Sequence, residues 1–325
     1  MHPIIERQKF DGLSEECYFP SHMSVLVTTS DPREVRKAFR TQLKSGKLLQ
    51  FPGAFSPFIA RMVQDQGFDG VYISGAGIAN DLGYPDVGLT TLSEVRNRGE
   101  AIRKACALPT LIDIDTGFGE AMSVARTVRE LEDAGLSACH LEDQVNPKRC
   151  GHLDNKSLVT TQDMVQKIRA AFSAKTDPNF LICARTDARA SEGLEQAIAR
   201  AKAYVDAGAE MIFPEALQNE KEFEIFRKEI KVPLLSNMTE FGKSELLTKN
   251  QLESLGYNLV IYPMTSFRLA MKAIEDGLKV IKEKGDQKSL LGNMQTRSRL
   301  YEILRYDEYN SFDQNIFNFK LGRDQ

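Results

Sequence analysis

Short runs of apolar and β-branched residues alternate along the chain with longer segments of helical period. This alternation predicts a parallel sheet covered by helices. The strand-like runs are eight in number: 48–51, 71–74, 110–115, 138–143, 180–187, 211–215, 233–237 and 259–263. Eight strand–helix units predict an α/β fold of the closed (β/α)8 TIM-barrel type. An open, doubly wound sheet stays an alternative, because periodicity does not show closure.

Two smaller patterns support the barrel. Residues 194–205 show one apolar helical face and one charged face; the apolar face holds Leu194, Ala197, Ile198, Ala201, Tyr204 and Val205. A glycine also recurs between a helix end and the next strand, where it suits a left-handed helix cap. These glycines are Gly67, Gly135, Gly208 and Gly256.

The chain divides into three parts. Residues 1–41 show no convincing strand, and we expect an N-terminal extension without chemistry. Residues 42–284 are expected to form the catalytic barrel. Residues 285–325 are expected to form one or two helices followed by an aromatic tail, which predicts a subunit contact; packing back on the same barrel is the alternative. The aromatic residues are Tyr301, Tyr306, Tyr309, Phe312, Phe317 and Phe319.

Composition narrows the classes of partner. A length of 325 residues suits one closed barrel, and 42 basic against 45 acidic residues give a net charge of −3. Such a balance gives no broad positive electrostatic field that would attract the phosphates of a nucleic acid. No apolar run approaches the roughly 20 residues that span a bilayer, and the start lacks a secretory apolar segment. We therefore expect a cytoplasmic protein whose five scattered cysteines are reduced.

Polar residues gather where the predicted strands end. In a barrel these ends form the active-site face. Asp113 and Asp115 lie two residues apart, on the same face of the third strand. Two carboxylates facing one cavity favour a hard cation, so we predict Mg²⁺, or Mn²⁺, with Asp86 and Glu142 completing the shell through water. Helix capping is the alternative for Asp115.

The loop from about 144 to 160 is long enough to be functional. It carries Cys150 between Lys148, Arg149 and His152. Positive charge around a thiol lowers its pKa and makes its proton transferable near neutrality. We therefore predict Cys150 as a catalytic proton donor, with an ordinary loop thiol as the alternative.

Several groups could bind carboxylates. Arg185 offers a forked guanidinium, although pairing with Glu215 or Asp187 is a competing account. A second carboxylate could meet Asn237 and Thr239. The turn formed by Ser74, Gly75 and Ala76 could present backbone amides to an anion.

The segment Lys148-Arg149-Cys150-Gly151-His152 resembles the lyase branch of the isocitrate lyase and phosphoenolpyruvate mutase superfamily. Further matches to methylisocitrate lyases run from about residue 37, at 72–75, 85–88, 113–119, 140–144, 184–188, 213–216, 237–242 and 294–297. Two positions depart from that pattern. Ala76 stands where relatives often have glycine, and Leu153 where many have arginine.

The resemblance implies a homotetramer of barrels whose final helices swap between subunits, and a role in the methylcitrate cycle of propionate catabolism. It implies Mg²⁺ bound chiefly through Asp113, with Asp86, Asp115 and Glu142 holding its waters. The keto-acid carboxylate of a small-molecule substrate would bind Ser74, Gly75 and Ala76, with Arg185 nearby. The succinate end would meet Gly151, His152, Asn237 and Thr239, and we count Glu215 with the binding residues.

The implied reaction cleaves 2-methylisocitrate to pyruvate and succinate, with Cys150 as acid and Lys148 and His152 beside it. Tyr72 is the first candidate for the base, which requires a lowered pKa; a carboxylate near the metal, acting with water, is the alternative. Isocitrate and 2,3-dimethylmalate are alternative substrates. A cysteine-nucleophile hydrolase and a non-catalytic metabolite-binding barrel are alternatives of other classes.

Overall fold

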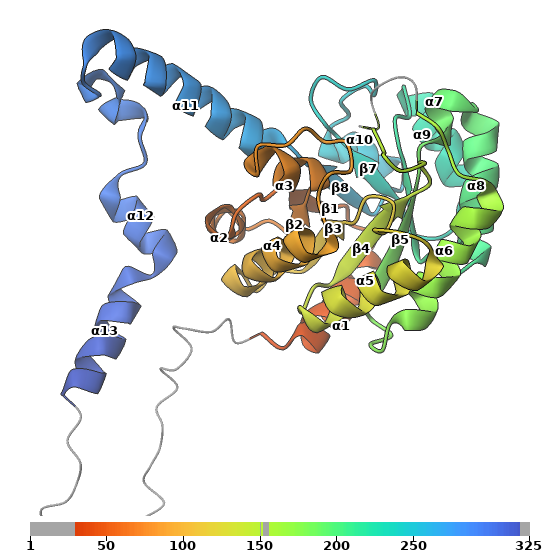
Figure 1. The fold of residues 1–325 in the computed structure, drawn as a ribbon, viewed down its shortest axis with the longest axis horizontal. Helices are drawn as coiled ribbons and strands as arrows, with labels where there is room; N and C mark the ends of the chain where they lie inside the picture. The colour runs from red at the N-terminus through yellow and green to blue at the C-terminus, as the bar shows by residue number, and fades with distance from the viewer. Residues whose placement is uncertain (1–29, 150, 152–155, 319–325) are drawn as a thin grey trace, which may run out of the picture.

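The computed structural model describes residues 30–149, 151 and 156–318, which form a barrel with a C-terminal arm (Figure 1). Within these residues all eight predicted strands are present and all pair in parallel. Their bounds are β1 Leu49–Pro52, β2 Val71–Ile73, β3 Thr110–Asp113, β4 Ala138–Glu142, β5 Leu181–Thr186, β6 Met211–Pro214, β7 Leu235–Asn237 and β8 Leu259–Tyr262.

The sheet closes into a barrel. Strands β2 to β6 pair in chain order, and β1, β8 and β7 form a second run. The two runs meet at both ends through parallel bridges, Gly53 with Tyr72 and Ile212 with Leu234. The predicted (β/α)8 barrel is confirmed, and the alternative of an open sheet is excluded.

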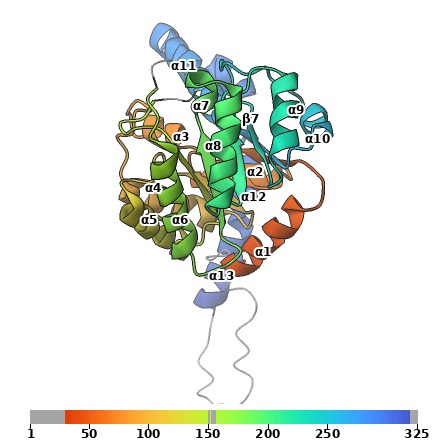
Figure 2. The same cartoon turned by 90° about the vertical axis from the view of Figure 1, so that its right-hand side faces the viewer.

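Helices surround the strands (Figure 2). Helix α4 begins with a capping box, in which Thr91 and Glu94 each accept the other's backbone N–H, as this sequence pattern favours. No helix in the described ranges is long and apolar enough to cross a membrane. The helices of the barrel are α2 Pro57–Asp65, α3 Gly75–Asp81, α4 Leu92–Ala105, α5 Ala121–Asp133, α6 Thr161–Ala174, α7 Ala188–Ser191, α8 Leu194–Asp206, α9 Glu220–Glu229 and α10 Lys249–Ser254.

Helix α8 confirms the amphipathic pattern. Ala197, Ile198, Ala201 and Tyr204 are buried against the barrel. Arg200 is buried as well, because its guanidinium is paired with a carboxylate of Glu192 and bonded to Tyr204. The four glycines predicted as left-handed helix caps have φ angles from 76° to 113°.

Helix α1 (Pro32–Leu43) precedes the first strand and belongs to the barrel. Phe39 and Leu43 join the cluster of side chains inside the barrel, and the Phe39 ring lies 5.4 Å from that of Phe51. The buried Arg36 donates to the backbone oxygens of Glu132 and Leu136. The predicted boundary of the N-terminal extension at residue 41 therefore falls inside this helix, and residues 1–29 lie outside the description.

Replacing Phe39 with alanine is expected to lower the free energy of unfolding by about 3–5 kcal/mol, because the buried ring would leave a cavity. Urea unfolding measures this change. Phe172→Ala on α6 is the matched control, since that ring is 42% exposed, and it is expected to cost under about 1.5 kcal/mol. Equal small losses in both variants would show that α1 does not close the barrel.

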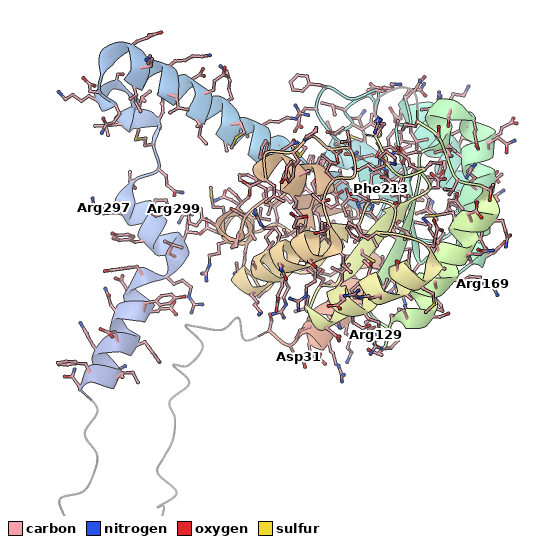
Figure 3. The ribbon with its side chains drawn as sticks, in the orientation of Figure 1. Asp31, Arg129, Arg169, Phe213, Arg297 and Arg299 are labelled. Carbon is pink, nitrogen blue, oxygen red and sulfur yellow. The ribbon has the colours of Figure 1, made fainter. Side chains whose placement is uncertain are left out.

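Beyond β8 the chain leaves the barrel as an arm. Its elements are α11 Thr265–Lys284, the 3₁₀ helix η2 Lys288–Asn293, α12 Arg297–Leu304 and α13 Tyr306–Phe317. Figure 1 shows α11 running away from the barrel, with α12 and α13 standing beside it. The described aromatic residues of the predicted tail lie on α12 and α13, so the expected tail after the helices is helical up to residue 317. Arg299 contacts Asp65 of α2, which ties α12 to the barrel (Figure 3).

Candidate active site

A cavity of about 180 Å³ opens at the carboxyl ends of the strands. It brings together eleven of the predicted site residues: Tyr72, Ser74, Ala76, Asp86, Asp113, Lys148, Gly151, Arg185, Glu215, Asn237 and Thr239. Gly75, Asp115 and Glu142 contact residues of this lining. Cys150, His152 and Leu153 lie outside the described residues.

Strand β3 places two carboxylates at the cavity. Asp113 ends the strand, and its Oδ1 accepts the backbone N–H of Asp115 at 2.9 Å. Its Oδ2 accepts the N–H of Gly75 at 3.2 Å. A Cβ on Gly75 would stand 2.9 Å from Asp113 Oδ2, so only glycine lets the chain after β2 come this close. Asp115 turns into the same region with a φ of 47°.

Lys148 joins two of the carboxylates. Its Nζ pairs with Asp86 and lies 2.9 Å from Asp115 Oδ1, and its side chain is 3% exposed. Burial opposes the charge, but the carboxylates around it hold the pKa of Lys148 well above its usual value. The ammonium group of Lys148 is therefore paired with carboxylates at the cavity.

Asp115 and Glu142 are two buried carboxyl groups of the site whose ionised forms are disfavoured. Burial raises the pKa of Asp115 to about 6, with Lys148 opposing and Asp113 adding to the shift. Burial also raises the pKa of Glu142 well above its usual value. Neither oxygen of Glu142 accepts a hydrogen bond from the described residues, although Arg185 Nε lies 3.3 Å from Oε2. A bound cation would favour the ionised form of both carboxyl groups.

The donor set fits a magnesium-type ion. In the described ranges no three His, Cys, Asp or Glu side chains converge closely enough to enclose a metal by themselves. Mg²⁺ commonly takes one or two protein carboxylates and keeps several waters, so a full protein cage is not needed. Oxygen ligands without cysteine favour Mg²⁺ or Mn²⁺ over zinc.

Arg185 lies at the centre of a buried ionic network. Its Nε and Nη2 donate to both oxygens of Asp187 at 2.9 and 3.1 Å, and Nη2 lies 3.2 Å from Glu215 Oε2. The guanidinium stacks 5.0 Å over the Phe213 ring, which Figure 3 labels in the barrel. The structural pairing weighed as a competing account is confirmed, and Arg185 lines the cavity at the same time.

Tyr72 meets a histidine that the sequence argument had passed over. The Tyr72 hydroxyl lies 2.9 Å from Nε2 of His140, and the same nitrogen lies 3.7 Å from Asp113 Oδ1. Burial lowers the pKa of His140 to about 4, so the ring is neutral at pH 7. Burial, and then the Asp113 carboxylate, hold the pKa of Tyr72 well above its usual value.

Two predicted binding residues have defined partners. Ser74 Oγ accepts the Gly77 N–H and caps α3. Asn237 Nδ2 lies 3.3 Å from both carboxylate oxygens of Glu215, while its Oδ1 is buried without a hydrogen-bond partner among the described residues.

Other residues of the lining were missed by the sequence argument. They are Asn80, Pro263, Met264 and Arg268. The same rule of strand ends would have found Pro263 and Met264, because they follow β8. His140 lies two residues before Glu142 on β4, so the strand period would have found it.

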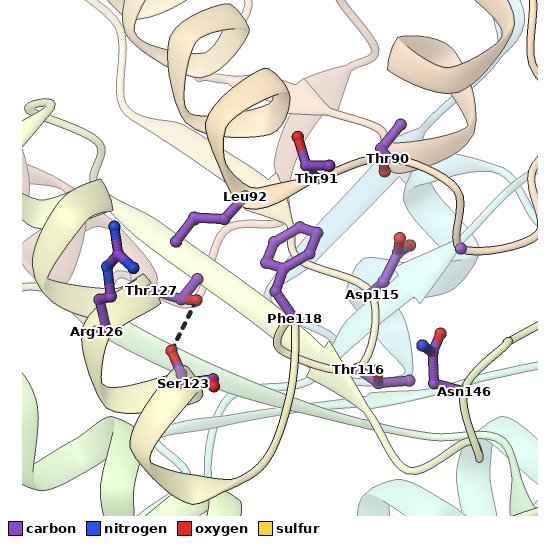
Figure 4. A pocket seen from close by; sticks show the side chains of 11 residues that line it. Thr90, Thr91, Leu92, Asp115, Thr116, Phe118, Ser123, Arg126, Thr127 and Asn146 are labelled. Atoms are coloured by element: carbon purple, nitrogen blue, oxygen red, sulfur yellow. Dashed lines mark hydrogen bonds between the residues drawn. The ribbon is translucent and has the colours of Figure 1, made fainter.

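A second cavity, of about 360 Å³, adjoins Asp115 from the side of α4 and α5 (Figure 4). Its lining is mostly threonine, serine and apolar side chains, and Asp115 is its only predicted site residue among those described. Arg126 at its edge points to Glu130 on the same helix. The acidic, basic and amide groups converge instead on the smaller cavity, which we take as the candidate active site.

The chain is similar to known proteins in sequence and in fold. The profile of the phosphoenolpyruvate phosphomutase family matches residues 39–282. "Probable 2-methylisocitrate lyase 1" of Corynebacterium glutamicum is 58% identical over 301 residues, which cover 92% of this chain and 99% of that protein. The chain belongs to the 2-methylisocitrate lyases of this family. The family resemblance expected from the segment at 148–152 is confirmed.

Two solved relatives extend the comparison. A 2,3-dimethylmalate lyase superposes with a TM-score of 0.81 at 31% identity, covering 91% of this chain and 99% of that one. A phosphonopyruvate hydrolase, solved with oxalate and Mg²⁺, gives a TM-score of 0.79 at 28% identity, covering 87% and 99%. The 2-methylisocitrate lyases thus share their barrel with enzymes of other substrates, one of which binds Mg²⁺.

Proposed function

We propose that this chain is a Mg²⁺-dependent carbon–carbon lyase that cleaves 2-methylisocitrate to pyruvate and succinate in the methylcitrate cycle. One observation carries the proposal. A single cavity holds an acidic cluster around Asp113 on one side and the Arg185 network on the other. A metal-assisted cleavage of a tricarboxylate needs acidic residues to hold the cation and a cationic group to bind a substrate carboxylate. The name of the Corynebacterium relative supports this substrate.

The metal would be held by Asp113, with Asp86, Asp115 and Glu142 binding its waters. A divalent cation there supplies Lewis-acid stabilisation of the alkoxide and of the forming keto acid. Mn²⁺ is expected to substitute, because it accepts the same oxygen ligands.

Carboxylate binding is assigned to both sides of the cavity. The keto-acid carboxylate would meet the turn of Ser74, Gly75 and Ala76, with Arg185 nearby. Ala76 keeps its backbone amide, so its departure from glycine costs no donor.

The succinate end would meet Gly151, His152, Asn237 and Thr239. Glu215 supports this group by accepting hydrogen bonds from Asn237.

The reaction needs one proton removed and one proton added. Loss of the tertiary hydroxyl proton lets the C–C bond break, and its electron pair passes to the carbon that becomes part of succinate. Cys150 would protonate that carbon, aided by the basic residues around it. Tyr72 stays the first candidate for the base, and a carboxylate near the metal, acting with water, is the alternative. Asp115, whose pKa burial raises to about 6, is one such carboxylate.

The decisive experiment measures pyruvate or glyoxylate release from 2-methylisocitrate, isocitrate and 2,3-dimethylmalate, with Mg²⁺ and with a chelator. We expect pyruvate from 2-methylisocitrate, in the presence of Mg²⁺ only. A cysteine-nucleophile hydrolase would work without metal, and a metabolite-binding barrel would release no product. Faster cleavage of isocitrate would show that isocitrate is the preferred substrate. The two substrates differ by one methyl group, which contributes only about 1–3 kcal/mol to discrimination between them.

Mg²⁺ is expected to stabilise the protein more at pH 7.5 than at pH 5. The pKa of Asp115 rises from 3.8 to about 6 on folding, so its neutral form stabilises the fold below about pH 4 and this contribution is lost as the pH rises through 6. A cation offsets the resulting repulsion. At a hundredfold excess over Kd the melting temperature should rise by about 5 °C at pH 7.5. An equal rise at both pH values would contradict the assignment.

We also propose that the arm joins this barrel to other subunits of a cytoplasmic homotetramer. Helix α11 has no buried residue, yet Met271, Ile274, Leu278 and Ile281 recur at spacings of three and four. Such a stripe needs a partner surface. Ile274→Glu with Leu278→Glu should lower the mass measured by sedimentation, whereas Lys282→Glu should leave it unchanged. A tetramer that survives the double substitution would exclude this contact.

A further inference from the structure

The side chain of Lys156 is buried, and the proposed mechanism gives it no role. Its side chain is only 2% exposed, and its Nζ lies 2.9 Å from Asp187 Oδ1. The same ammonium group donates to the backbone oxygen of Gly151. A lysine at this depth is costly unless its donors are paired, and these two acceptors supply the pairing.

Gly151 lies directly on the binding network. A Cβ at this position would stand 2.2 Å from Arg185 Nη2 and 2.5 Å from Glu215 Cγ. The main chain therefore touches both side chains, and any displacement of Gly151 would change the surface that faces the cavity. Lys156 holds the carbonyl of this residue.

The other partner of Lys156 is itself fixed. Asp187 is fully buried, accepts two hydrogen bonds from Arg185, and donates its backbone N–H to Asp143 Oδ1 at 2.9 Å. The Asp187 carboxylate thus binds both the Arg185 guanidinium and the Lys156 ammonium group. The position of Gly151 is thereby set relative to the Arg185 guanidinium.

The main chain of Arg149 is also fixed by hydrogen bonds to a side chain. The buried Gln144 accepts the Arg149 N–H at 2.9 Å and donates to the Arg149 oxygen at 2.8 Å. Side chains from both ends of the loop therefore fix the main chain of Arg149 and of Gly151.

We infer that Lys156 is a positioning residue that fixes the Gly151 main chain against Arg185 and Glu215, and so shapes the subsite for the succinate end. This inference rests on the proposed function, which assigns that end to Gly151. Lys156 acts through Gly151 and Asp187 and does not itself touch substrate. Its removal should weaken binding of one product and spare the other.

The test compares product inhibition in Lys156→Met and in the native enzyme. Methionine fills similar space but lacks the ammonium group. The inhibition constant of succinate should rise about tenfold to a hundredfold, as for loss of one charge-assisted hydrogen bond, while that of pyruvate should stay within about twofold. The kcat for 2-methylisocitrate should fall as well.

Lys175→Met is the matched control. Lys175 has a side chain 7% exposed, pairs with Glu210 at 2.8 Å and donates to two backbone oxygens, but it lies before β5, at the opposite end of the barrel. It should lower the melting temperature by a similar amount and leave both inhibition constants unchanged. Lys156→Gln keeps a donor and should give a smaller, succinate-selective change, which serves where Lys156→Met does not fold.

The outcomes separate the two proposals. Native protein that releases no pyruvate overturns the proposed function, and the inference with it. Native activity with equal weakening of succinate and pyruvate in Lys156→Met, or with no change in either, overturns the inference alone, because a purely structural lysine would behave in this way.

Discussion

Replacing Cys150 with serine is expected to lower kcat for 2-methylisocitrate by about 100- to 10,000-fold, the usual contribution of a positioned general acid. A serine hydroxyl is a far weaker acid than a thiol flanked by basic residues. Steady-state pyruvate release measures the effect. KM should change little, because the proton is donated after the C–C bond breaks.

Cys106→Ala is the matched control for this substitution. Cys106 is buried at the end of α4, before β3, and therefore at the opposite end of the barrel. Its replacement should leave kcat unchanged. A Cys150→Ser enzyme with native turnover would remove the thiol from the mechanism and leave the acid to be found elsewhere.

Replacing Asp113 with asparagine is expected to lower kcat/KM by about 1,000-fold or more and to abolish the stabilisation by Mg²⁺. The substitution keeps the shape but removes the charge that would hold the cation. Lewis-acid stabilisation is worth several kcal/mol, and each 1.36 kcal/mol is tenfold in rate. Pyruvate release and thermal melting, each with and without Mg²⁺, measure the two effects.

Asp177→Asn is the control for Asp113→Asn. Asp177 is also buried, but it pairs with Arg36 of α1 at 3.1 Å, far from the cavity. This variant should lose stability while its kcat/KM and its response to Mg²⁺ stay native. Native kcat/KM in Asp113→Asn, or an unchanged melting shift with Mg²⁺, would show that the metal does not depend on Asp113.

Most of the barrel was predictable because it depends on local pattern. The strand runs are short, apolar and bounded by glycine or helix caps, so their places follow from periodicity. The strand ends then placed Asp113, Glu142 and Arg185 on one face. Helix α1 lies in the stretch predicted as an extension, although Phe39 and Leu43 stand at helical spacing and meet the barrel interior.

The segment around Cys150 shows which features follow from the sequence and which depend on the three-dimensional fold. The eight strand–helix units, the acidic pair at β3 and the basic pentapeptide can be found from the sequence alone, because strand period and residue chemistry are properties of neighbours along the chain. The three-dimensional fold was needed to show that the sheet closes, that Lys148 pairs with Asp86 and Asp115, that Lys156 bonds to Gly151, and that burial raises the pKa of Tyr72. Pairing partners and desolvation depend on groups brought together from distant strands, and no local pattern encodes them.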